Sequence, residues 1–165
     1  MDKNQINTVV KELVRMHKAG EEFNTKKEGA GWNPGAWEGV GHDRENRVNV
    51  TDINKIVKKV VKNVYPDVKL SARKDHGGYH DAITVEVVEC DTHIIKYTYT
   101  EEEKSGNWPP HAREYTEKGK AVMGLIKNVL AYFNKNNSDS MTDYFEVGFY
   151  SYITHASNLG KDIVI

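Results

Sequence analysis

Residues 51–88 read TDINKIVKKVVKNVYPDVKLSARKDHGGYHDAITVEVV, and this stretch decides the fold. Its first part carries apolar residues at the i, i+3, i+4, i+7, i+8 and i+11 spacing of one helical face. The members of this stripe are Ile53, Ile56, Val57, Val60, Val61 and Val64. Pro66 ends the helix, and Val68, Leu70 and Ala72 then alternate with polar residues, which predicts a strand with one buried face.

The Gly77-Gly78 pair predicts a turn into a second strand, in which Ile83, Val85 and Val87 lie on one side. A third strand is possible after Asp91-Thr92, because Ile95, Tyr97 and Tyr99 alternate with polar residues. Residues 101–110 are acidic at first and end in two prolines, so we expect a loop there.

The flanking segments add two helices and a strand. Residues 4–18 repeat the helical spacing, and residues 20–49 form a long Gly-rich loop that contains Trp32 and Trp37. Thr116 is the predicted N-cap of a helix that runs to about residue 134. Residues 143–154 alternate as a strand, with Phe145, Val147, Phe149 and Ile153 on one face.

These elements predict an α+β fold in one domain, residues 1–165. We expect a mainly antiparallel sheet with two helices packed on one face, formed by residues 51–154, plus an N-terminal helix (4–18) and the long Gly/Trp loop (20–49). Residues 155–165 are expected to be a tail.

Composition limits the class of protein. The 165 residues carry a formal net charge of -1, with 38% hydrophobic and 28% charged residues, which suits one soluble domain and argues against a general nucleic-acid binder. Cys90 is the single cysteine, so no internal disulfide is possible. No apolar stretch approaches the roughly 20 residues of a membrane span, and no secretory signal is evident, so we expect a cytoplasmic protein.

A family resemblance rests on short motifs. Residues 64–75 (VYPDVKLSARKD), the Gly77-Gly78 turn, Ile83-Thr84-Val85 and residues 140–146 (SMTDYFE) resemble a small domain of the large polyvalent protein-associated group. That group occurs in proteins of phages and other mobile elements. The Trp-Thr-Asp-Gly-Pro-like turn of the family is absent, and residues 1–50 lie outside the resemblance. The resemblance implies a mobile-element accessory protein in the host cell cytoplasm, with antagonism of a host defence as one role, and it supplies no catalytic residues.

Motifs for chemistry are weak. Asp75, His76, His80 and Asp81 could gather round a metal, but the favoured interpretation is a polar hairpin turn, because so Gly-rich a loop fixes none of the ligands. No nucleophile elbow or phosphate-binding loop is present. We therefore predict no catalytic residues, no metal and no cofactor.

The sheet offers the best candidate surface. If the helices cover the face of Leu70, Val85 and Val87, the opposite face collects aromatic and basic residues. The predicted partner-binding residues, with the two tryptophans of the loop, are Lys69, Arg73, Tyr144, Tyr150, Tyr152, Trp32 and Trp37. Three interpretations stay open: a protein interface, a stacking platform for single-stranded nucleic acid, or an internal layer covered by residues 4–18 and the Trp loop.

The predicted function is that of a non-enzymatic binding protein of a phage or mobile element, acting on a host or phage protein. The alternative is a single-stranded nucleic-acid-binding domain that uses the aromatic and basic sheet face. A metal-dependent enzyme built on the turn at His76 is a third hypothesis.

Overall fold

The computed structural model describes residues 1–26, 35–43, 45–77, 80–138 and 146–165. The helices are α1 (Lys3–Ala19), α2 (Val50–Val64), α3 (Glu101–Ser105), α4 (Glu117–Tyr132) and the short 3-10 helix η1 (Ser157–Leu159). The strands are β1 (Asn24–Lys26), β2 (Trp37–Gly39), β3 (Lys69–Gly77), β4 (His80–Glu89), β5 (Ile95–Tyr99), β6 (Ala112–Tyr115), β7 (Lys135–Asn136), β8 (Tyr150–His155) and β9 (Gly160–Val164).

The long helices begin at side-chain caps. Asn49 caps α2 by accepting a hydrogen bond from the backbone N–H of Thr51 at 2.8 Å. Thr116 caps α4 by accepting from the N–H of Gly119 at 3.0 Å. The predicted N-cap at Thr116 is therefore confirmed, and the expected helices over 4–18 and from residue 51 to Pro66 agree with α1 and α2 to within two residues.

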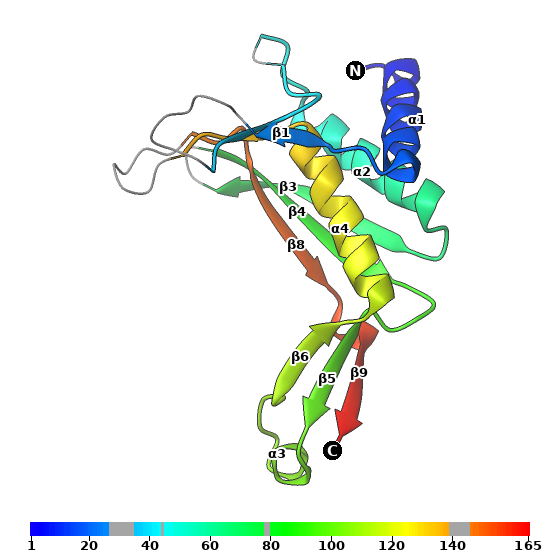
Figure 1. Ribbon diagram of the computed structural model, residues 1–165, viewed down its shortest axis with the longest axis vertical. Helices are drawn as coiled ribbons and strands as arrows, with labels where there is room; N and C mark the ends of the chain where they lie inside the picture. The colour runs from blue at the N-terminus through cyan, green and yellow to red at the C-terminus, as the bar shows by residue number, and fades with distance from the viewer. Residues whose placement is uncertain (27–34, 44, 78–79, 139–145) are drawn as a thin grey trace.

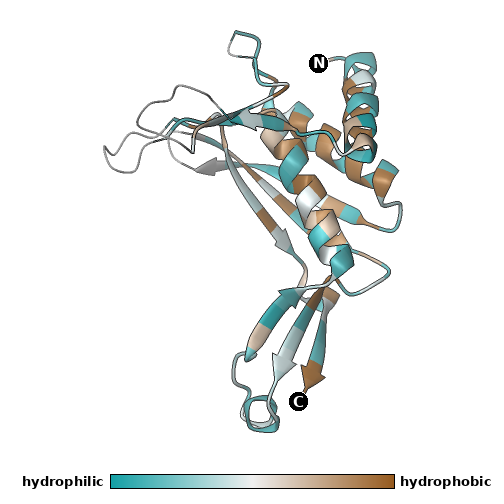
Figure 2. Cartoon of the chain, viewed as in Figure 1, coloured by the Kyte–Doolittle hydropathy of each residue, from teal (hydrophilic) through white to brown (hydrophobic). Residues whose placement is uncertain are grey.

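The hydrophobic core lies between the helices and one face of the β3–β4–β8 sheet (Figure 1). Ile56 and Val60 of α2 are completely buried, as are Ile83 and Val85 of β4. Figure 2 shows the hydrophobic residues of the helices as stripes rather than whole turns, as expected for helices with one buried side. The apolar face predicted for residues 51–64 is therefore confirmed.

The described strands form small separate sheets rather than one, and two of these sheets are mixed. In the described residues the orders are β1-β2-β7, β3-β4-β8 and β6-β5-β9. The pairs β3–β4 and β5–β6 are antiparallel, whereas β8 runs parallel to β4 and β9 runs parallel to β5. The α+β class and the mainly antiparallel pairing are confirmed, whereas the expected single sheet is three separate sheets in the described residues.

Three local expectations also need correction. The predicted tail, 155–165, contains η1 and β9, because β9 pairs with β5 along its whole length. The expected loop over 101–110 begins with α3, and the expected loop over 20–49 contains β1 and β2. Part of the strand expected over 143–154 lies outside the described residues, and its described part becomes regular only at β8.

The β6–β5–β9 sheet extends away from the helices as an arm, with α3 at its tip (Figure 1). α1 lies on the other side of the molecule, packed against α2. Within the ranges given above, no helix is both long enough and apolar enough to cross a membrane.

Candidate functional site

No helix among the described residues covers one face of the β3–β4–β8 sheet. Strand alternation places Leu70, Val85 and Ile153 toward the core, so the residues between them point the other way. We call this second side the open sheet face. Its described members on the three strands are Ser71, Arg73, Asp75, Thr84, Glu86, Tyr150, Tyr152 and Thr154.

The register brings predicted residues from different strands together. Arg73 of β3 lies opposite Thr84 of β4, and Thr84 lies opposite Tyr152 of β8. Tyr150 lies in the neighbouring row, beside Ala82. The sequence could assign faces only within each strand. The register shows that the face of β3 with Arg73 and the face of β8 with Tyr150 and Tyr152 are on the same side of the sheet.

The exposed fractions of the side chains show whether this face is accessible or is covered by an internal layer. Tyr152 is 56% exposed, Tyr150 is 36% exposed, and the Arg73 side chain is 60% exposed. α1 packs against α2 on the far side of the core and does not cover these residues. The interpretation in which residues 4–18 cover this face as an internal layer is therefore wrong, and Trp32, which it also involved, lies outside the described residues.

The basic residues of this sheet are paired with carboxylates. Arg73 Nε lies 3.3 Å from Asp75 Oδ1, and the Thr84 hydroxyl donates a hydrogen bond to Asp75 Oδ2. Lys69 Nζ, at the start of β3, lies 2.8 Å from Glu89 Oε1. Both pairs are largely exposed and contribute little to stability. They do, however, remove the excess positive charge that nucleic-acid binding needs.

The remaining predicted residues do not join this face. Trp37 lies on β2, in another sheet, where it is half-buried and pairs with Lys26 and Asn136. Trp32 and Tyr144 lie outside the described residues, as does Phe145. The open sheet face therefore contains Arg73, Tyr150 and Tyr152, with Lys69 at its margin.

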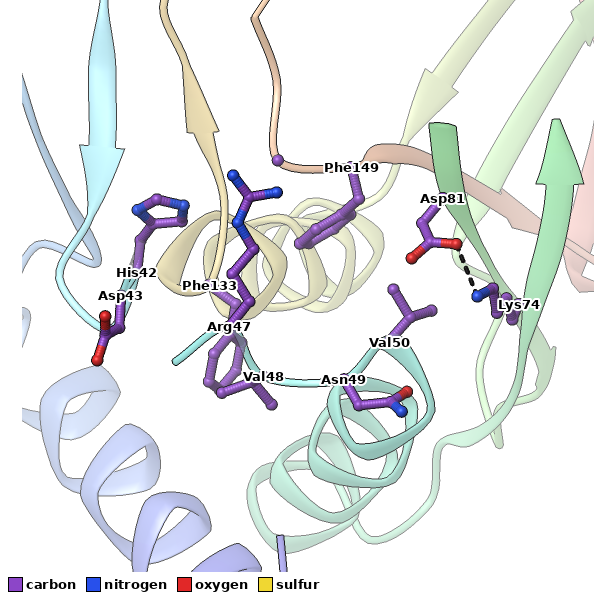
Figure 3. Close-up of a pocket in the computed structure, with 12 residues that line it drawn as sticks. His42, Asp43, Arg47, Val48, Asn49, Val50, Lys74, Asp81, Phe133 and Phe149 are labelled. Carbon is purple, nitrogen blue, oxygen red and sulfur yellow. Dashed lines mark ion pairs between the residues drawn. The ribbon is translucent and has the colours of Figure 1, made fainter. Parts of the chain in front are cut away.

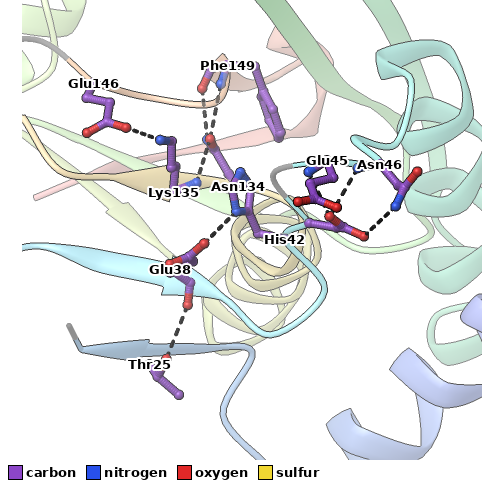
Figure 4. Close-up of polar contacts among 10 residues, drawn as sticks. Thr25, Glu38, His42, Glu45, Asn46, Asn134, Lys135, Glu146 and Phe149 are labelled. Carbon is purple, nitrogen blue, oxygen red and sulfur yellow. Dashed lines mark hydrogen bonds and ion pairs between the residues drawn. The ribbon is translucent and has the colours of Figure 1, made fainter. Parts of the chain in front are cut away.

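A second polar region, which the sequence did not predict, lies where β2 and β7 meet the end of α4 (Figure 4). The buried Asn134 side chain donates to the carbonyl of Phe149 at 2.8 Å and accepts from its N–H at 3.1 Å. Lys135, also buried, forms an ion pair with Glu146. These contacts fix the segment that leads into β8.

His42 belongs to the same region. Its Nδ1 lies 2.7 Å from Glu38 Oε1, and its side chain is only 3% exposed. Sequence reasoning missed this group because Glu38, His42, Lys135 and Glu146 come from segments far apart in the chain and follow no motif. The i, i+4 spacing of Glu38 and His42 was the available signal, but it is common by chance.

The described residues hold no cluster of three or more His, Cys, Asp or Glu side chains arranged to bind a metal ion. The side chains of His76 and His80 lie outside the description, so the polar-turn interpretation of that hairpin stays a prediction.

Comparisons with protein-family models, with curated proteins and with solved structures find no match to this chain. The resemblance to the large polyvalent protein-associated group therefore stays a prediction.

Proposed function

We propose that this chain is a non-enzymatic binding protein that recognises another protein through the open sheet face. The observation that carries the proposal is the row in which the exposed Tyr152 and Arg73 flank the buried Thr84, on a sheet side that no described helix covers. Tyrosine and arginine are the residue types that most often anchor protein interfaces, because each offers a large contact area together with a hydrogen-bonding group.

Charge favours a protein partner over single-stranded nucleic acid. A nucleic-acid platform needs aromatic residues beside cations that are free to contact phosphates. Here Arg73 is engaged by Asp75 and Lys69 by Glu89, and Glu86 adds a further acidic residue. A face with both signs of charge suits a partner with a complementary pattern.

The edge of the sheet supports the same proposal. β8 stands last in the order β3-β4-β8, so no described strand pairs with its outer side. An unpaired strand edge can accept an extended segment of a partner through backbone hydrogen bonds. Tyr150 and Tyr152 lie on this strand, so a partner strand added there would also contact them.

Site-specific crosslinking tests the proposal. A photoreactive amino acid placed at Tyr152 should form a discrete protein adduct in cells, and Arg73→Ala should reduce its yield. The matched control is the same amino acid at Trp108, which is 67% exposed on the arm. Equal adducts at both positions, or none at Tyr152, would contradict the proposed interface.

Two further measurements complete the test. The Arg73→Ala/Tyr152→Ala variant should keep the melting temperature of the parent protein, because both side chains are exposed, while it loses more than about 1 kcal/mol of partner affinity. Fluorescence anisotropy with a labelled thymidine oligonucleotide tests the alternative. Salt-sensitive binding that this double variant abolishes would replace the protein partner with nucleic acid.

A further inference from the structure

A pocket on the helix side of the sheet lies apart from the open sheet face. It has a volume of about 320 Å³ (Figure 3). It lies between the start of α2, the last part of β3 with the first part of β4, and the segment before β8. Phe133, Phe149, Val48 and Val50 supply apolar walls, and His42 and Arg47 supply polar ones. It plays no part in the proposed protein interface.

His42 presents an unsatisfied acceptor at this pocket. Its Nδ1 lies 2.7 Å from the Glu38 carboxylate, which can only accept, so Nδ1 carries a proton, and in the neutral form of the ring Nε2 is then the acceptor. Nε2 is buried and has no hydrogen-bond partner. In Figure 3 the ring lies on the pocket wall, on the side that faces Arg47. A buried polar atom without a partner is costly, and a bound group that donates a hydrogen bond would remove that cost.

Arg47 supplies positive charge at the same place. Its guanidinium lies between His42 and Phe149 at the pocket, and no described residue forms an ion pair or hydrogen bond with it. The other charges are already engaged. Asp81 pairs with Lys74 at 2.6 Å, and the Asp43 carboxylate accepts from the N–H groups of Glu45 and Asn46, which also lowers its pKa.

The N-terminus of α2 adds to this positive potential. Asn49 and Val50, the cap and first residue of this 15-residue helix, both line the pocket. The positive end of the helix dipole therefore faces it, as at many anion sites.

We infer that this pocket binds the phosphate group of a small phosphorylated molecule. A phosphate or phosphate monoester that keeps one proton has both features the walls require: an O–H to donate to His42 Nε2, and anionic oxygens to accept from Arg47 and face the start of α2. A carboxylate or sulfate at neutral pH has only acceptors, so it leaves Nε2 unsatisfied.

Titration with inorganic phosphate, followed by amide NMR, tests the inference on the whole chain. Phosphate should shift the signals of residues 41–43, 45–50 and 148–149 in a saturable way, and sodium sulfate at equal ionic strength should bind at least about tenfold more weakly, as expected for the loss of one hydrogen bond to a charged group. Absence of saturable shifts at these residues would overturn the site. Equal binding of sulfate would overturn the role given to Nε2.

Variants locate the binding. Arg47→Ala should weaken phosphate binding about tenfold or more, and because this side chain is exposed the fold should be kept. The control is Lys161→Ala, an exposed cation on β9 in the arm, which should bind phosphate like the parent protein. His42→Phe should lose the preference for phosphate over sulfate, because phenylalanine has no atom that can accept a hydrogen bond from the phosphate. If the His42 variant unfolds, the comparison of Arg47→Ala with Lys161→Ala still tests the site. Equal weakening of phosphate binding by these two substitutions would show general charge attraction instead of a site.

Discussion

Lys118 Nζ lies 3.0 Å from Asp67 Oδ1, and this ion pair ties the turn after α2 to the first turn of α4. The same ammonium lies 4.6 Å from the centroid of the Tyr65 ring, so it contacts both an anion and an aromatic face. Both side chains of the pair are less than one-third exposed, which limits screening by water.

This pair predicts a pH dependence of stability. The hydrogen bond from Lys118 lowers the pKa of Asp67 below its ordinary value. A carboxyl group whose pKa is lower in the folded state stabilises the fold above its unfolded pKa of about 3.9, and that contribution is lost as the pH falls through the folded value. Asp67→Asn should therefore lower the free energy of unfolding at pH 7 and should have a smaller effect near pH 3.

Urea denaturation at a series of pH values measures this difference. The matched control is Glu117→Gln, which also removes a carboxylate paired with a lysine in the first turn of α4, but whose side chain is 90% exposed. It should change stability little at any pH. A constant difference between Asp67→Asn and the parent across the whole range would contradict the assigned role of Asp67.

Truncation of the core should be costly. Ile56, Val60, Leu125 and Phe149 are at most 5% exposed and belong to one hydrophobic cluster. Changing Ile56, Leu125 or Phe149 to Ala should each cost about 2 to 5 kcal/mol of unfolding free energy, and Val60→Ala somewhat less, because each leaves a cavity. Thermal and urea denaturation check this, with Val164→Ala on the arm, 42% exposed, as the control that should be nearly neutral. Unchanged stability in two of the core variants would disprove the packing.

Two glycines predict opposite effects of the same substitution. A Cβ on Gly39 would overlap the carbonyl oxygen of Ala131, so Gly39→Ala should separate β2 from the end of α4 and destabilise the protein. Gly124, in the middle of α4, has open space around it. Gly124→Ala should stabilise the protein by about 0.5 to 1 kcal/mol, because alanine favours a helix more than glycine does. Calorimetry on both variants should give melting temperatures on opposite sides of the parent value.

Asn134 should be sensitive although it is polar. Asn134→Ala would leave the N–H and carbonyl of Phe149 without their side-chain partner in a buried place, which should cost about 2 to 4 kcal/mol if each unsatisfied group costs 1 to 2. Asn137→Ala, which removes a single half-buried contact with Glu146, is the control and should cost less. Equal effects in urea denaturation would show that the two bonds to Phe149 do not hold that segment.

The sequence predicted the elements whose signals are local. Helix α2 follows from its apolar stripe and Pro66, α4 follows from its stripe and the cap at Thr116, and the inward face of β4 follows from the alternation of Ile83, Val85 and Val87. α3 also had a local signal that was missed, since Thr100 and Glu103 form a capping box at its start. Strand alternation predicted which residues share a face within one strand, but not how the strands pair.

Partner choice between strands could not be predicted in the same way. β8 alternates identically whether it pairs parallel or antiparallel, so only the folded chain shows that it lies parallel to β4. β9 has only a weak alternation of polar and apolar residues. The need for glycine at position 160 comes from a distant residue, because the Tyr97 ring occupies the space that a Cβ would take. Likewise, the two faces with Arg73 and Tyr152 coincide only through long-range register, and the His42 pocket draws on segments that no motif connects.

The parallel placement of β8 and β9 has a consequence for synthesis of the chain on the ribosome. Residues 150–164 complete the sheets of both β4 and β5, which were made some sixty residues or more earlier. Until this segment emerges, both central strands have an unpaired edge, and such edges attract other nascent chains. Helices α1, α2 and α4 can form before that moment. The open sheet face, which includes Tyr152, can form only after this segment has been translated.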